Sequence, residues 1–135
     1  MVIPETEIIW RKIIKFALDQ NEAGNIIRSC APGKIQIRNT YYESCLLVGN
    51  TELHADWPLD SVEALTGKDL APIVEMQPQI LLIGTGSKQI FPQPRIFIPL
   101  MDANIGYEIM DTAAACRTYN VLLSEDRKVL ALLFP

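Results

Sequence analysis

Histidine and cysteine are scarce in this sequence, and their scarcity narrows the chemistry that it can support. The sequence has one histidine, His54, and three cysteines, Cys30, Cys45 and Cys116, which show no CxxC spacing. An odd number of widely spaced cysteines argues against a disulfide framework and against a zinc site. A Ser-His-Asp or Cys-His catalytic system would depend on His54, and nothing in its neighbourhood favours one. We therefore predict no metal, no cofactor and no catalytic residues.

The sequence also lacks a basic cluster and a long apolar run. Its formal net charge is −4, so we expect no nucleic-acid partner. The longest apolar run, Val129 to Phe134, is far shorter than the roughly 18 residues of a membrane span. Glu5 and Glu7 stand where a signal peptide would be positively charged. These features predict a cytoplasmic protein from a bacterium, with no transmembrane segment.

The composition that remains is that of a globular domain. Hydrophobic residues make up 49% of the 135 residues and charged residues 21%, which fits one domain with one core. We place this domain at residues 23–135 and predict an N-terminal amphipathic helix extension at residues 1–22. Ile9, Ile13 and Phe16 fall on one face of that helix. We expect this face to pack on its own domain or on a second copy in a homodimer; the alternative is docking on a partner or peripherally on a membrane.

The first half of the domain reads as short strands. Lys34 to Arg38 alternates strictly between apolar and polar residues, which is typical of a half-buried strand. Ile26 to Cys30 precedes it across a Pro-Gly turn, and Tyr41 to Val48 follows it. We predict an N-terminal meander of three antiparallel strands.

The second half alternates between helices and strands. We predict strands at residues 80–84, 107–110 and 129–134, and helices at residues 69–75, 95–104 and 112–123. Asp60 and Glu63 have the spacing of a helix cap, Pro99 should kink its helix or delay the start, and Gly106 is expected to end that helix. The strands at 80–84 and 107–110 should be parallel neighbours joined by a right-handed crossover. The fold class is thus α/β (α+β mixed), a three-layer domain with a central mixed sheet, an N-terminal antiparallel meander and a C-terminal strand–helix–strand unit.

Two of these strands end on small and polar residues, and this predicts a candidate site. Ligands of open α/β sheets bind outside the carboxyl ends of parallel strands. The residues at these ends are Gly84, Thr85, Gly86, Ser87, Asp111 and Thr112. One interpretation is a crevice that binds a small polar or anionic ligand, with the first N–H groups of the following helix as donors. The alternatives are a tight turn with Asp111 or Thr112 as a helix cap, or an edge that binds a protein partner.

The helix after the second strand carries the other candidate residues. Cys116 lies near the helix start beside Arg117, two features that lower the pKa of a thiol. Its helix face also contains Ala113, Asn120 and Leu123, which favours a small buried thiol; a nucleophile or redox sensor is the alternative. Arg117, Tyr119 and Asn120 form a polar set that we expect to anchor the helix to neighbouring loops.

Three segments resemble a known family: Leu81 to Gly86, the Phe91-Pro92-x-Pro94 segment, and the long stretch from Gly106 to Leu122 that contains Met110-Asp111-Thr112 and Ala114 to Asn120. They look like a family of small bacterial proteins of unknown function that includes the mitochondrial complex I assembly factor 3. The resemblance spans about residues 25–133. It implies a compact three-layer domain with a mixed sheet. The eukaryotic relative, in the mitochondrial matrix, helps to build respiratory complex I with a second assembly factor and without known catalysis, and no reaction is established for the bacterial relatives.

Together these observations predict a non-enzymatic interaction module that binds a protein partner, in the manner of an assembly factor for a respiratory membrane complex. The alternative function is a small-molecule-binding protein or a simple enzyme. It would use the crevice at the two strand ends, with Arg117 beside it.

Overall fold

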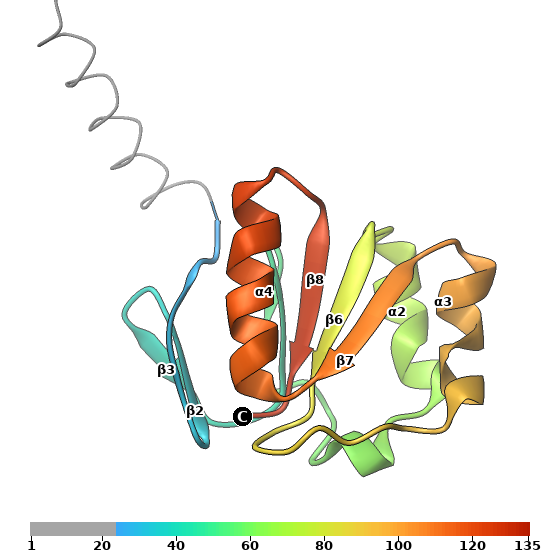
Figure 1. Cartoon of the computed structure of the whole chain (residues 1–135), viewed down its shortest axis with the longest axis horizontal. Coiled ribbons are helices and arrows are strands. Elements are labelled where there is room, and N and C mark those ends of the chain that lie inside the picture. Colours follow the sequence, from blue (N-terminus) through green and yellow to red (C-terminus); the bar gives the residue numbers. More distant parts are fainter. Residues whose placement is uncertain (1–23) are drawn as a thin grey trace, which may run out of the picture.

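The computed structural model describes residues 24–135, and Figure 1 shows how their helices and strands are arranged. The helix extension expected at residues 1–22 lies outside the described residues. The described chain forms a mixed α/β domain with one five-stranded sheet, one three-stranded sheet and helices on both faces of the larger sheet. This is the fold class that the pattern of the sequence predicts.

The five-stranded sheet has the strand order β5-β4-β8-β6-β7. Its strands are Leu53–His54 (β5), Leu46–Gly49 (β4), Val129–Leu133 (β8), Ile80–Gly84 (β6) and Gly106–Met110 (β7). The central strands β8 and β6 are almost entirely apolar and buried, as is typical of strands that are covered on both faces. β4 pairs antiparallel with β5 and β8, whereas β6 pairs parallel with β8 and β7, so the sheet is mixed.

The parallel pairing of β6 and β7 is confirmed. Gly84 pairs with Met110 at the end of these strands, and Gly84 also pairs with Leu133 of β8. Three strands therefore end at the same rim of the sheet. The residues that follow them, Thr85, Asp111 and Phe134, leave the sheet side by side.

The smaller sheet is the predicted meander, with one correction. Ile27–Ala31 (β1), Lys34–Ile37 (β2) and Thr40–Tyr42 (β3) pair antiparallel in that order. The single strand predicted from Tyr41 to Val48 is wrong, because the chain passes from one sheet to the other between Tyr42 and Leu46. At this break the Ser44 hydroxyl donates a hydrogen bond to the Asp56 carboxylate (2.6 Å), and Cys45 is buried in the larger core.

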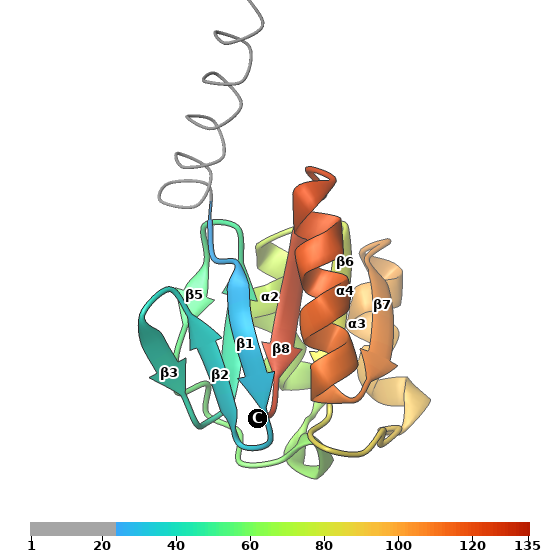
Figure 2. The same ribbon diagram turned by 60° about the vertical axis from the view of Figure 1, so that its left-hand side comes forward.

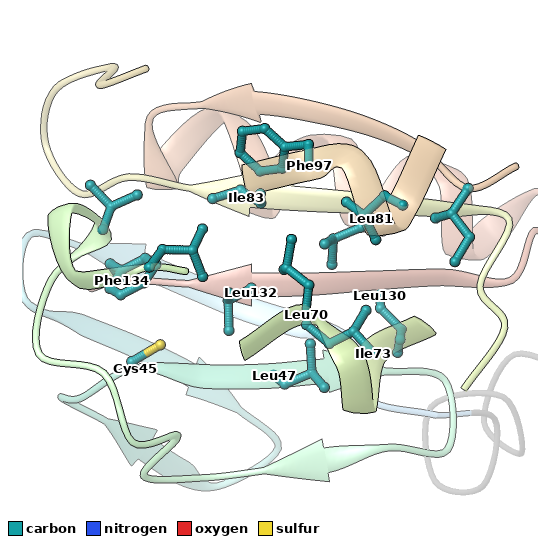
Figure 3. Packing of buried hydrophobic residues seen from close by; sticks show 14 residues of the cluster. Cys45, Leu47, Leu70, Ile73, Leu81, Ile83, Phe97, Leu130, Leu132 and Phe134 are labelled. Atoms are coloured by element: carbon teal, nitrogen blue, oxygen red, sulfur yellow. The ribbon is translucent and has the colours of Figure 1, made fainter. Parts of the chain in front are cut away.

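Two apolar clusters cover the two faces of the larger sheet. On one face, α2 (Ala71–Glu75) and α3 (Ile98–Asp102), each preceded by a short 3-10 helix, lie over the sheet. Figure 3 shows side chains of this cluster meeting between the sheet and the helices, among them Leu70, Ile73, Leu132 and Leu130. On the other face, α4 (Thr112–Ser124) and the three-stranded sheet cover a second cluster, which contains Ile35, Ile37, Leu82, Ala115 and Tyr119.

The cap expected at Asp60 and Glu63 is wrong. A 3-10 turn of Val62–Ala64 follows Ser61 instead, and no side chain caps it. The capping interaction forms at the next 3-10 helix, Gly67–Leu70. There the Asp69 carboxylate accepts hydrogen bonds from the Thr66 N–H (2.7 Å) and hydroxyl (2.9 Å). Both pairs have the same spacing in the sequence, so only the tertiary fold decides between them.

The helix predicted at residues 95–104 divides in two. A 3-10 helix spans Pro94–Phe97 and α3 begins at Ile98, so Pro99 lies in the first helical turn, where a missing N–H costs nothing. The helix ends at Asp102, and the left-handed residue that follows it is Asn104 rather than Gly106. Asn104 adopts a positive φ of 56°, and Ile105 N–H then bonds to the Leu100 carbonyl at 2.9 Å, as at a left-handed helix terminus. Gly106 is the first residue of β7.

Helix α4 is bound to β1 through two side chains. Figure 2 shows the two elements side by side. The Tyr119 hydroxyl donates to the carbonyl of Asn25 (2.8 Å). The Asn120 amide accepts from the Ile27 N–H (3.0 Å) and donates to the Ile27 carbonyl (2.8 Å). The anchoring role expected for Tyr119 and Asn120 is therefore confirmed, with β1 and the residues before it as the anchor point.

We expect Tyr119→Phe to lower the free energy of unfolding by about 1–2 kcal/mol, because it leaves a buried carbonyl without its partner. Asn25 is only 5% exposed, so water cannot replace the lost donor. Urea denaturation at neutral pH measures the change. Tyr41→Phe is the matched control, since its ring is 53% exposed; an equal loss in both variants would contradict the assignment.

Candidate functional site

The rim where β6, β7 and β8 end holds most of the predicted site residues together. Thr85 is 5% exposed and Thr112 is 4% exposed, so both hydroxyls lie inside the protein. Asp111 is half-buried and Ser87 is exposed. The parallel pairing thus brings the two polar clusters together, and the hydrogen bonds around them show how each group is used.

The Thr85 hydroxyl organises the turn that follows β6. It accepts a hydrogen bond from the Ile90 N–H (3.1 Å) and donates to the Lys88 carbonyl. The Thr85 N–H bonds to the Met110 carbonyl at 2.9 Å. Thr85 therefore holds its own loop closed and ties it to the end of β7.

The Thr112 hydroxyl joins three segments of the chain. It accepts a hydrogen bond from the Gly86 N–H (2.7 Å) and donates one to the Phe134 carbonyl (2.6 Å). The Thr112 N–H in turn bonds to the Gly86 carbonyl at 2.9 Å. This residue is therefore not the helix cap but the link between the ends of β6 and β8 and the start of α4.

The helix cap is Asp111. Its carboxylate accepts a hydrogen bond from the Ala114 N–H (2.8 Å) at the first turn of α4, which gives one of the unpaired helix donors a partner. The two sequence alternatives for capping, Asp111 or Thr112, are thus resolved in favour of Asp111.

Two glycines allow these elements to approach. A Cβ at Gly84 would lie 3.0 Å from the Thr112 Cα and hydroxyl and from a Leu133 methyl, so a larger residue would require these neighbours to move apart. Gly86 has a φ of +97°, which other residues rarely adopt. Close approach of the backbone was expected here, and the partner in this structure is the protein itself.

The predicted burial of Cys116 is confirmed, but its helix face is shifted. Ala113 is exposed, and the buried side of α4 is formed by Thr112, Ala115, Cys116 and Tyr119. Burial raises the pKa of the Cys116 thiol well above its usual range, the neighbouring Cys30 raises it further, and Arg117 lowers it. Burial outweighs the effect of the cation, so Cys116 is a protonated thiol. Arg117 lies on the exposed side of α4.

Binding of a small anion at this rim stays a prediction. If it occurs, phosphate or a nucleotide raises the midpoint of thermal unfolding, because a ligand stabilises the state that binds it. The exposed Arg117 would supply the positive charge, so Arg117→Gln should reduce the shift while Arg127→Gln responds like the unmodified protein. A flat response to phosphate and nucleotides would count against the site.

A groove that the sequence analysis did not identify lies elsewhere on the molecule. It has a volume of about 530 Å³ and runs between the 3-10 turn at Val62–Ala64 and the segment before α3. Its lining is mostly apolar, with charged side chains at Glu63 and Arg95; the apolar members include Val62, Leu65, Ile90, Phe91 and Ile96. The signal in the sequence was the Phe91-Pro92-x-Pro94 segment, a proline-rich loop that carries a large apolar residue.

No metal-binding set is found in the part of the chain that the structure describes. Within residues 24–135, no three His, Cys, Asp or Glu side chains are grouped so that they could hold a metal ion. His54 is exposed and packs edge-on against Trp57, with ring centroids 5.9 Å apart.

The fold is that of a class of small mixed α/β domains that known proteins share. A crystal structure of a Bordetella parapertussis protein has a TM-score of 0.78 and 32% sequence identity, covering 84% of this chain and 97% of that chain. Residues 27–134 match the family described as "Protein of unknown function (DUF498/DUF598)". The chain belongs to this family, as the resemblance of its motifs indicated.

Two curated relatives carry names that bear on function. The "13 kDa major membrane protein" of Francisella tularensis is 30% identical over 93 residues, 69% of this chain and 76% of that protein. NADH dehydrogenase (ubiquinone) 1 alpha subcomplex assembly factor 3 of Danio rerio is 33% identical over 120 residues, 84% of this chain and 66% of that protein. The chain thus spans slightly less than two thirds of this assembly factor's length. Between residues 24 and 135, no helix has the length and apolar character needed to cross a membrane.

We expect Thr112→Val to lower the free energy of unfolding by about 2–3 kcal/mol, because it leaves the buried Phe134 carbonyl and the partly buried Gly86 N–H without partners. Thr112→Ser keeps the oxygen and loses one methyl group, which costs about 1 kcal/mol. Denaturant unfolding of both variants measures the difference. If the serine variant were as unstable as the valine variant, packing rather than hydrogen bonding would hold the rim.

Proposed function

We propose that this protein is a non-enzymatic binding module that assists the assembly of a respiratory membrane complex. Its partner is a subunit of that complex, held on a surface formed by the connection between β6 and β7 and by the neighbouring residues 62–67. We call this the β6–β7 surface; it consists of the groove described above and of the exposed side chains of Phe91, Ile98 and Met101.

The observation that carries the proposal is the clustering of exposed apolar side chains in this connection. Within residues 24–135, five large hydrophobic side chains are exposed: Tyr41 53%, Phe91 70%, Ile98 48%, Met101 58% and Val121 55%. Three of the five lie between residues 91 and 101. Single exposed apolar residues are ordinary, but a concentration of them marks an interaction site.

The groove beside Phe91 suits a protein side chain. Its floor is apolar, and Glu63 and Arg95 stand among its lining residues with exposed side chains. Apolar centres with charged and polar surroundings are the usual composition of a protein interface. Phe91 belongs to the aromatic residues that contribute most to binding when a partner covers them.

The relatives indicate the kind of partner. The match to an assembly factor of NADH dehydrogenase extends over 84% of this chain, and it includes the segment that forms the β6–β7 surface in this structure. A protein that assists assembly needs a surface for its client and no catalytic group. We therefore infer that the client is a subunit of a respiratory NADH dehydrogenase.

Affinity purification of the tagged full-length chain from its native host, after chemical crosslinking, tests this proposal. We expect recovery of NADH dehydrogenase subunits, and a drop of about tenfold or more in the double variant Phe91→Ser, Met101→Ser, because buried apolar anchors dominate binding. Val121→Ser is the matched control, with a similarly exposed apolar residue on α4.

Two outcomes would contradict the proposal. One is recovery of the chain alone, which would indicate self-association and would be checked by sedimentation. The other is recovery of respiratory subunits in equal amounts with both variants, which would place the contact away from the β6–β7 surface. Thermal unfolding of each variant shows whether it is folded before the comparison is made.

A further inference from the structure

Two cysteines that are far apart in the sequence are neighbours in the fold. Cys30 lies on β1 and Cys116 on the second turn of α4, and both pack in the same apolar cluster. Figure 2 shows β1 and α4 lying side by side. All three cysteines are free thiols in the structure.

The contacts between β1 and α4 place the two thiols together. Tyr119 bonds to Asn25, and Asn120 bonds to Ile27. The strand and the helix run in opposite directions, so the next contact along β1 meets the preceding turn of α4, where Cys116 lies. Several Cα atoms of the two elements lie within 8 Å of each other, so the strand and the helix pack directly against one another.

The electrostatics of Cys116 agree with this placement. Burial is the main cause of the raised pKa of Cys116, and the neighbouring Cys30 raises it further. The third cysteine, Cys45, belongs to the cluster on the opposite face of the sheet, and burial raises its pKa to about 12.

The two thiols differ in access to solvent. Cys30 is half-buried, whereas Cys116 is only 3% exposed. A dissolved oxidant therefore reaches Cys30 first, and Cys116 is placed to react only with a group that is already attached to Cys30. This is the arrangement of an attacking thiol and a resolving thiol.

We infer that Cys30 and Cys116 are a redox modification site, which forms a reversible disulfide between β1 and α4 on exposure to a low-molecular-weight disulfide such as oxidised glutathione. The Cys30 thiolate attacks one sulfur of oxidised glutathione, so that a mixed disulfide forms and one glutathione thiolate leaves. Cys116 then loses its proton, and its thiolate attacks the Cys30 sulfur. The new bond joins Cys30 to Cys116 and the second glutathione leaves as a thiolate. Two electrons pass to oxidised glutathione, and the two protons of the cysteines end on the two glutathione thiols.

The bond would fasten two layers that are otherwise joined by hydrogen bonds and packing. It closes a long loop of the chain, and such a crosslink restricts the unfolded state. We expect the oxidised protein to unfold at a temperature about 5–10 °C higher than the reduced protein. Reduction with dithiothreitol should return the lower value.

The test uses the full-length protein, reduced, purified and then incubated with oxidised glutathione at neutral pH. Free thiols are blocked with N-ethylmaleimide under denaturing conditions, and the digest is analysed by mass spectrometry. We expect a crosslinked peptide pair that contains Cys30 and Cys116 and is lighter by two hydrogen atoms than the reduced pair. Cys45 should carry the maleimide.

Matched variants make the result decisive. Cys45→Ser should form the same crosslink, Cys30→Ser should form none, and Cys116→Ser should stop at the mixed disulfide on Cys30. Because Cys30 is half-buried, its serine variant tests the proposal even if Cys116→Ser does not fold. A mixed disulfide that persists on Cys30 in the folded unmodified protein, with Cys116 free, would overturn the inference, as would absence of any crosslink.

Discussion

The arrangement of this domain depends most on the two hydrogen bonds of the Thr112 hydroxyl group. It bonds to the chain after β6 and to the chain after β8 while its own residue begins α4. Gly84 leaves the space that this contact needs, because a side chain there would press against Thr112. Two strand ends and the start of a helix are thereby held at one point, and Thr85 adds the end of β7 to the same rim.

A second set of bonds holds α4 farther along its length, where Tyr119 and Asn120 bind the residues of β1 and those before it. One face of the large sheet is thus covered by a helix that is fixed at its start and near its end. The opposite face carries short helices, the groove and three of the exposed apolar side chains. The two faces of the sheet therefore differ: one is covered by a long helix and a second sheet, and the other by short helices beside the groove.

The sequence analysis was most successful where hydrophobic periodicity and chain connectivity act alone. The alternation in Lys34–Ile37 and the apolar runs of β6 and β8 predicted buried strands, and the rule for crossovers predicted parallel pairing. It failed where neighbouring residues could form the same cap or turn equally well. The pairs Asp60–Glu63 and Thr66–Asp69 have the same spacing, and either could form a helix cap. Asn104 and Gly106 could each form the left-handed turn after α3. The passage of the chain between the two sheets at Ser44 leaves no periodic signal in the sequence. The groove depends on segments that meet only in the folded chain, so the Phe91-Pro92-x-Pro94 segment could indicate only one of its two sides. The sequence predicts that the residues at the two strand ends lie close together, as they do. The spacing of these residues in the sequence could not show that the Thr85 and Thr112 side chains bond to the protein's own backbone.

The place of β8 in the sheet has a consequence for how the chain is made. This strand follows every other strand in the sequence, yet it lies between β4 and β6 in the middle of the sheet. While the chain is still emerging from the ribosome, β4 and β6 have no common neighbour and their apolar faces stay open. The sheet therefore closes only after β8 has been synthesised, and until then β4 and β6 keep unpaired edges, which are the parts of a folding chain most prone to aggregation.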